Sequence, residues 1–151
     1  MNILVTGGAG YVGSIVAEEL LGRGHRVIVL DNLQQGHREA VPPEAEFHLA
    51  DICDAQAVEG VFRHTKIDAV MHLAAETAVA YSVTDPKRYF KNNVVGGLNL
   101  LEVMLKYETN KLVFSSSASV YGQPGTTRVS ALPPYKLVEV GYHAVTARLG
   151  E

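Results

Sequence analysis

Cysteine, tryptophan and positive charge are scarce in this chain of 151 residues, which has one cysteine, no tryptophan and a formal net charge of −3. Because Cys53 has no partner within the chain, an internal disulfide is excluded, and a reducing, cytoplasmic location is expected. Without a basic excess the chain is not expected to bind nucleic acid. No apolar run approaches the roughly 20 residues that cross a bilayer, so no membrane contact is expected.

The composition also excludes other kinds of site and segment. The six histidines show no metal-ligand spacing and have no cysteine pair beside them, so we expect no metal site. Met1-Asn2 leads directly into an apolar run, and no signal peptide is expected. The length, with 47% hydrophobic residues, suits one α/β domain over residues 1–151.

Residues 1–32 contain the most informative pattern. A short β-forming run, Ile3–Val5, is followed by a glycine-rich turn, a helical stretch that ends at Gly24, and a second apolar run, Val27–Leu30. The glycines of the turn are Gly7, Gly10 and Gly13. Asp31 follows the second run directly. This order of strand, glycine turn, helix, strand and acid is the order that a dinucleotide site needs.

Each part of this pattern has a physical role. Glycines allow a tight turn, a close approach of backbone N–H groups to a pyrophosphate, and close packing of the helix on the sheet. The helix N-terminus adds unpaired N–H groups and the positive end of its dipole. Asp31 can accept hydrogen bonds from both ribose hydroxyls and would repel a 2′-phosphate, which favours NAD over NADP.

Strands and helices alternate along the rest of the chain. Strands are expected at 46–49, 67–73 and 111–114, and helices at 55–64 and 86–107. This alternation predicts a doubly wound parallel sheet with right-handed crossovers. Small or polar residues follow each strand, at the edge where such sheets bind ligands; they are Gly7, Asp31, Asp51, Ala74 and Ser117. Taken alone, Asp51 fits a helix cap better than a ligand contact.

With these segments the chain resembles the extended short-chain dehydrogenases/reductases, which have a Rossmann-like fold and use NAD on nucleotide sugars. The matching segments are Thr6–Gly13, Asp31–Leu33, Asp51–Ile52, His72–Ala75, Asn92–Val94 and Ser115–Gly122. The resemblance implies NAD as the cofactor. The cofactor-binding residues that it implies are Gly7, Gly10, Tyr11, Val12, Gly13, Asp31, Asn32, Asp51, Ile52, Leu73, Ala74, Ala75, Asn92 and Ser115.

Within that family the chain is most similar to the enzymes that interconvert UDP-glucose and UDP-galactose. This resemblance implies a UDP-sugar substrate and epimerisation at C4 by transient hydride transfer. It also implies Ser117, Tyr135 and Lys136 as catalytic residues, with the tyrosine as the base and the lysine lowering its pKa. Dehydratases of the family usually carry an acidic pair near the position of Ala118-Ser119, and its absence favours an epimerase.

The stretch 124–151 departs from the family pattern and looks shortened or gapped. The family's lysine stands four residues after its tyrosine, whereas Tyr135 and Lys136 are adjacent and would point about 100° apart on a helix. We expect the family's carboxyl-terminal substrate domain to be absent or truncated. The chain is then either a fragment, or segments joined across gaps, or a degenerate domain. A dehydratase of the same family and a non-catalytic NAD-binding module remain alternative functions.

The resemblance also implies a homodimer as a candidate assembly, because the family pairs its subunits through the long helix that begins near Pro86. The apolar residues of this helix include Val94, Leu98, Leu101 and Leu105. They would serve either that contact or packing on the sheet. We expect most of them to pack on the sheet.

Overall fold

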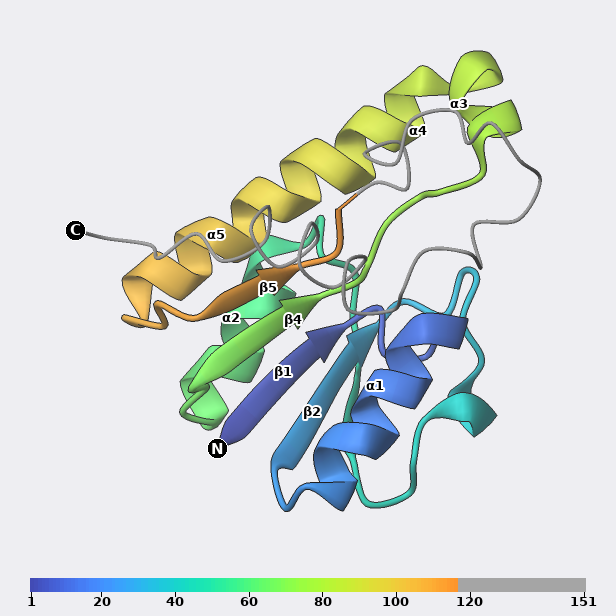
Figure 1. The fold of residues 1–151 in the computed structure, drawn as a ribbon. Coiled ribbons are helices and arrows are strands. Elements are labelled where there is room, and N and C mark those ends of the chain that lie inside the picture. The colour runs from blue at the N-terminus through green and yellow to red at the C-terminus, as the bar shows by residue number, and fades with distance from the viewer. Residues whose placement is uncertain (117–151) are drawn as a thin grey trace, which may run out of the picture.

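The computed structural model of the protein describes residues 1–116, apart from the side chains of residues 79–81. Five parallel strands form one sheet in the order β3-β2-β1-β4-β5 (Figure 1). The strands are β1 (Asn2–Thr6), β2 (Arg26–Asp31), β3 (Glu46–Leu49), β4 (Ala69–His72) and β5 (Leu112–Phe114). With β1 at the centre, this is the strand order of the doubly wound dinucleotide-binding fold, and the predicted fold class is confirmed.

Helices lie on both faces of the sheet (Figure 1). The longer ones are α1 (Tyr11–Gly22), α2 (Ala55–His64) and α5 (Gly97–Lys106). Short helical segments are η1 (Arg38–Ala40), α3 (Val79–Thr84), α4 (Pro86–Phe90) and the π-helical η2 (Lys91–Gly96). Within residues 1–116, no helix combines the length and the hydropathy that a bilayer-spanning segment requires.

The strands divide their side chains between two cores because successive residues of a strand point to opposite faces. Leu4 belongs to the core under α2 and α5, together with Phe62 and Met104. Ile3 and Val5 belong to the core under α1. Burial on both faces explains why β1 and β2 read as unbroken apolar runs.

The predicted helix at 55–64 matches α2 and owes its start to one side chain. Asp54 accepts hydrogen bonds from the backbone N–H groups of Gln56 and Ala57, at 3.0 and 3.1 Å. An acid at this position satisfies donors that the helix itself leaves unpaired. Val58 and Phe62 then pack into the core, one turn apart.

The predicted helix over 86–107 is present as one unbroken helical segment, 86–106, with a π-helical middle that the sequence did not predict. The segment starts at Pro86 behind the capping residue Asp85, but its middle, η2, has the wider π-helical turn. Where η2 meets α5, Gly96 packs so closely that a Cβ there would lie 2.6 Å from Cγ1 of Ile52. The Asn99 amide donates to the Ile52 carbonyl at 3.2 Å. These contacts hold η2 and α5 against the loop after β3.

The expected packing on the sheet is wrong for three of the four apolar residues named above, whereas Leu101 is partly buried against the core. Val94, Leu98 and Leu105 are 48%, 53% and 61% exposed. The buried residues of α5 are instead Leu100, Val103 and Met104. Sequence periodicity alone does not distinguish these two sets, because apolar residues occur on both faces of the segment.

Candidate functional site

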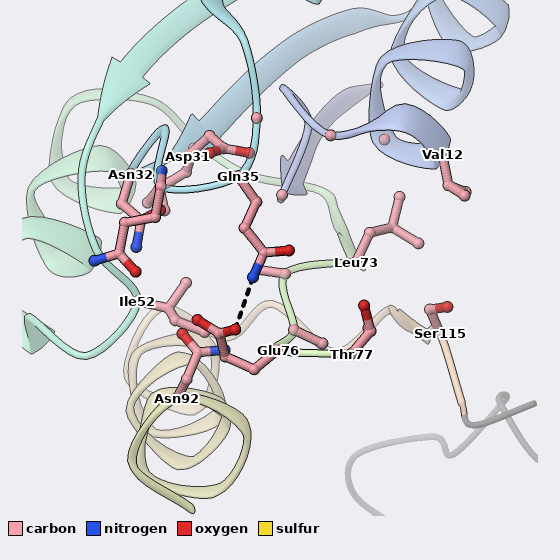
Figure 2. A pocket seen from close by; sticks show the side chains of 18 of the residues that line it. Val12, Asp31, Asn32, Gln35, Ile52, Leu73, Glu76, Thr77, Asn92 and Ser115 are labelled. Atoms are coloured by element: carbon pink, nitrogen blue, oxygen red, sulfur yellow. Dashed lines mark hydrogen bonds between the residues drawn. The ribbon is translucent and has the colours of Figure 1, made fainter. Parts of the chain in front are cut away.

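A cleft of about 430 Å³ lies at the carboxyl ends of the strands (Figure 2). Every predicted cofactor-binding residue except Asp51 lines it. The lining comes from the turn after β1, the loops after β2, β3 and β4, the segment η2 and the end of β5. Of the five residues expected to face one cleft, Gly7, Asp31 and Ala74 line it, Asp51 does not, and Ser117 lies outside the described residues.

The glycine turn brings backbone atoms closer together than any side chain would allow. Gly7 has φ +73°, and a Cβ on it would lie 2.6 Å from the backbone nitrogen of Ala74. A Cβ on Gly13 would lie only 2.1 Å from the Gly7 carbonyl oxygen. Both positions therefore require glycine, one for its backbone conformation and one for packing α1 onto the turn.

The N-terminus of α1 faces this cleft without a side-chain cap. Gly10 is the N-cap residue, and no side chain accepts a hydrogen bond from the first turn. Gly10, Tyr11, Val12 and Gly13 all line the cleft. The N–H groups and dipole of a helix start favour an anion. The turn thus fits the pyrophosphate of a dinucleotide.

Asp31 connects the glycine turn with the loop after β2, next to the start of α1. Its side chain is buried, and Oδ2 accepts a hydrogen bond of 3.0 Å from the backbone N–H of Ala9. Oδ1 accepts a bond of 2.8 Å from the N–H of Leu33, which has a φ of +57°. A carboxylate offers about four acceptor positions, so Asp31 can still accept from ribose hydroxyls.

Asp51 lies in a second cavity, of about 560 Å³, which shares Gln34, Glu76 and Asn92 with the cleft. Burial raises the pKa of the Asp51 carboxyl, but hydrogen bonds from Cys53 and Asn32 outweigh it and hold the pKa below its usual value. The Asn32 amide donates to Asp51 at 3.2 Å. Asp51 therefore lies on an extension of the cleft, where it also orients Asn32.

His72 is not part of the cleft lining, although it was interpreted as part of the cofactor segment. The side chain is buried inside the sheet, where Nδ1 shares a hydrogen bond of 2.6 Å with the Thr6 hydroxyl. Burial lowers the pKa of His72 to about 4, so the ring is neutral at pH 7. The residue is a buried side chain at the carboxyl end of β4.

Sequence reasoning missed a polar group in the middle of the cleft, centred on Glu76. Gln35, Gly36, Glu76 and Thr77 also line the cleft but were not among the predicted residues. Glu76 follows Ala74-Ala75 directly, so it is an acid near a strand end, like Asp31 and Asp51. The same rule that selected those two acids would have selected this one.

The charges in the lining are unusual for a site that accepts phosphate. Among the described residues that line the cleft, Asp31 and Glu76 are the charged side chains, and there is no lysine or arginine. The backbone N–H groups of the glycine turn are therefore the groups that can bind the pyrophosphate. A further phosphate on the ribose would meet Asp31 and no cation from this lining.

The predicted catalytic residues Ser117, Tyr135 and Lys136 lie outside the described residues. Ser115, at the end of β5, lines the cleft and its backbone N–H donates to the His72 carbonyl at 3.0 Å. Within residues 1–116, no group of three His, Cys, Asp or Glu side chains is arranged to hold a metal ion.

Curated proteins of known activity resemble the chain over most of its length. It is 46% identical over 134 residues to the UDP-glucose 4-epimerase of Lacticaseibacillus casei. This alignment covers 89% of the chain and 40% of the relative. It is 46% identical over 137 residues to the UDP-glucose 4-epimerase of Bacillus subtilis, covering 86% of the chain and 40% of that protein. The chain thus spans about 40% of the length of these relatives.

Solved structures and a protein family give the same result. The structure of UDP-glucose 4-epimerase of Thermus thermophilus, solved with NAD, matches with a TM-score of 0.79 and 39% sequence identity. The match covers 96% of this chain and 52% of the Thermus chain. The structure of the Thermotoga maritima enzyme, solved with UDP-glucose, matches with a TM-score of 0.78 and 43% sequence identity. The match covers 83% of this chain and 41% of the Thermotoga chain. Residues 3–145 match the NAD dependent epimerase/dehydratase family. The expected family and its NAD cofactor are confirmed, and the chain belongs to the NAD dependent epimerase/dehydratase family.

Proposed function

We propose that this chain is the cofactor-binding half of an NAD-dependent enzyme that epimerises a UDP-sugar at C4. The observation that carries the proposal is the cleft, in which the uncapped start of α1, the glycine turn and Asp31 lie together. The sugar is proposed from the relatives, which are named UDP-glucose 4-epimerase. One of the similar structures holds UDP-glucose.

In this proposal, residues of the chain hold NAD in an extended position along the strand ends. The N–H groups of the α1 N-terminus bind the pyrophosphate, and Asp31 binds the adenosine ribose. The nicotinamide end lies toward Ser115, and the bound NAD⁺ supplies the hydride acceptor. Ser117, Tyr135 and Lys136 are proposed as the catalytic residues from the sequence resemblance. Tyrosine, with a pKa of about 10, needs a nearby cation to act as a base at neutral pH.

A non-catalytic NAD-binding module is the second candidate, and one observation favours it. Tyr135 and Lys136 are adjacent, whereas the proposed mechanism needs both side chains on one helix face. A polypeptide of these 151 residues is therefore not expected to convert UDP-galactose to UDP-glucose. Binding of NAD alone would suit both candidates, so the test must include turnover.

A chimera tests whether residues 1–116 can serve as the cofactor half of an active epimerase. Residues 1–116 replace the corresponding segment of the Lacticaseibacillus casei epimerase, to which the chain is 46% identical. If the segment is a working cofactor half, the chimera retains NAD and forms UDP-glucose from UDP-galactose at about 1 per second or faster. The matched control carries Gly13→Ala, which should remove NAD and turnover together. A chimera that retains NAD without turnover would support the non-catalytic module.

We also propose that two copies of the chain pair through η2 and α5. The proposal is supported by the exposed apolar residues Val94, Leu98 and Leu105. Their spacing of four and seven residues puts them on one face of a helix. Exposed apolar stripes of this kind are typical of surfaces that bind another protein.

A further inference from the structure

Three polar side chains form a connected group across the cleft. Gln35, in the loop after β2, donates from Nε2 to Oε2 of Glu76 at 2.7 Å. Arg88, in α4, donates from Nε and from a terminal guanidinium nitrogen to Oε1 of the same carboxylate, at 2.8 and 2.6 Å. These three residues are called the strap below. They connect segments 41 and 12 residues apart in the sequence.

The centre of the strap is firmly held. The Glu76 side chain is only 8% exposed, and its carboxylate charge is paired with Arg88. The backbone N–H of Glu76 donates to Oδ1 of Asn93 at 2.8 Å, and Nδ2 of Asn93 donates to the Glu76 carbonyl at 3.0 Å. The carboxylate therefore has a fixed position, which is a requirement for an acceptor that orients another side chain.

The Gln35 end of the strap belongs to a loop anchored on the glycine turn. The backbone N–H of His37 donates to the Ala9 carbonyl at 3.0 Å. Gly36 packs so closely that a Cβ on it would lie 2.7 Å from the carbonyl carbon of Ala9. Gln35 itself is exposed. Its hydrogen bond to Glu76 is thus the part of the strap that can open without disturbing the ion pair between Glu76 and Arg88.

The hydrogen bond from Gln35 to Glu76 crosses the cleft between its two ends. In Figure 2 it lies between Asp31 and Asn32 on one side and Val12 and Ser115 on the other. All six residues line the cleft. A ligand that reaches from Asp31 to Ser115 has to pass this bond.

We propose that the strap is a gate that a dinucleotide must open to enter or leave the cleft, with Glu76 as the positioning residue that holds Gln35 across it. The proposal rests on the proposed function, because NAD is the ligand assigned to the cleft there. Arg88 neutralises Glu76, so that the carboxylate does not repel the pyrophosphate that passes it. Because the bond would form again over the bound ligand, the strap slows entry and exit alike.

The kinetics of NADH binding test the gate, with stopped-flow fluorescence for association and a chase with excess NAD⁺ for dissociation. Gln35→Ala should raise both rate constants by about tenfold, the lower end of what one hydrogen bond to a charged group contributes. The dissociation constant should change less than either rate. Gln35 is exposed, so its replacement leaves both cores intact. Glu76→Gln should act in the same direction, because the neutral amide loses the charge that strengthens the hydrogen bonds from Gln35 and Arg88.

Two comparisons make the test specific. The double variant Gln35→Ala/Glu76→Gln should exchange NADH no faster than the faster single variant, since both remove one contact. Gln56→Ala is the matched control, because Gln56 is an exposed glutamine of α2 that lines neither the cleft nor the second cavity. It should leave both rates unchanged.

Other outcomes overturn the gate. Unchanged rates in Gln35→Ala would do so while leaving NAD binding itself intact. Faster dissociation with unchanged association would make Gln35 a direct ligand contact instead of a gate. A wild-type chain that does not bind NADH would overturn the proposed function as well, so the two failures are distinguishable.

Discussion

The carboxylate of Asp31 accepts a hydrogen bond of 3.0 Å from the backbone N–H of Ala9, 22 residues earlier in the chain. This bond ties the end of β2 to the glycine turn. The other oxygen of Asp31 accepts from Leu33, so one side chain fixes the turn and the loop that border the cleft. A residue selected from the sequence as a ribose contact is therefore also part of the protein's own framework.

Asp31→Ala should lower the stability of the chain as well as its affinity for NAD. The change leaves the N–H groups of Ala9, which is 1% exposed, and Leu33 without an acceptor. We expect the free energy of unfolding to fall by about 2 kcal/mol. Asp31→Asn keeps one carbonyl oxygen and should lose about half as much. Urea unfolding measures both variants, and an Ala variant as stable as the wild type would contradict the framework role.

Gly13→Ala should distort the glycine turn, because its Cβ would lie 2.1 Å from the backbone oxygen of Gly7. We expect NAD affinity to fall by at least about tenfold, since the N–H groups proposed to bind the pyrophosphate move apart. The control is Gly60→Ala in α2, where nothing lies within 4 Å of the new methyl group. This control should stabilise the chain by about 0.5–1 kcal/mol. Titration calorimetry and thermal unfolding together check both results, and undiminished NAD affinity in Gly13→Ala is the opposing result.

The buried His72 should make stability depend on pH below neutrality. Burial lowers its pKa from 6.5 to about 4 in the folded chain, while the unfolded chain keeps the higher value. Between these two pH values the unfolded state binds a proton that the folded state does not. Above pH 6.5 the histidine therefore does not lower the free energy of unfolding. Below that pH the free energy of unfolding falls by about 1.4 kcal/mol per pH unit.

Urea unfolding across this pH range in wild type and in His72→Gln measures that pH dependence. The glutamine can still form a hydrogen bond with Thr6 but does not titrate, so the slope of stability against pH should become shallower. The same change at His64, which is exposed at the end of α2, should leave the slope as it is. Identical slopes in wild type and His72→Gln would show that the ring is not held neutral by burial.

Leu98→Glu should prevent pairing of two copies through α5. Leu98 is 53% exposed and lies on the apolar stripe with Val94 and Leu105. A charge at this position would be buried without a partner in such an interface. Sedimentation velocity should show a dimer for the wild type and a monomer for the variant. Leu49→Glu, at a leucine that is 68% exposed on β3, should remain dimeric. A monomeric wild type would exclude the proposed pairing.

The strands were predictable because their residues carry local signals. The apolar runs that became β1 and β2 are buried on both faces, and even the short edge strand Glu46–Leu49 has the predicted bounds. Asp54 supplies a local cap, so the start of α2 was also visible in the sequence. The glycine turn and Asp31 were recognisable because the spacing between them reflects one strand, one helix and one more strand.

Features that depend on distant contacts were not predictable in this way. Glu76 meets Gln35 across 41 residues, and no local pattern marks that pair. The π-helical turn of η2 depends on how closely Gly96 approaches Ile52 in the folded chain. Similarly, Leu98 and Leu100 are both leucines of one helix, and only the packed structure shows that Leu100 is buried and Leu98 exposed.

We propose above all that the cleft binds NAD and that Asp31 excludes NADP. Equilibrium binding of NAD⁺ and NADP⁺ to the same purified protein, at one salt concentration, tests it most directly. The cleft lining has Asp31 at the ribose end and no described lysine or arginine. We therefore predict that NAD⁺ binds at least about tenfold more tightly than NADP⁺. NADP⁺ binding as tightly as NAD⁺, or no binding of either, would contradict the claim.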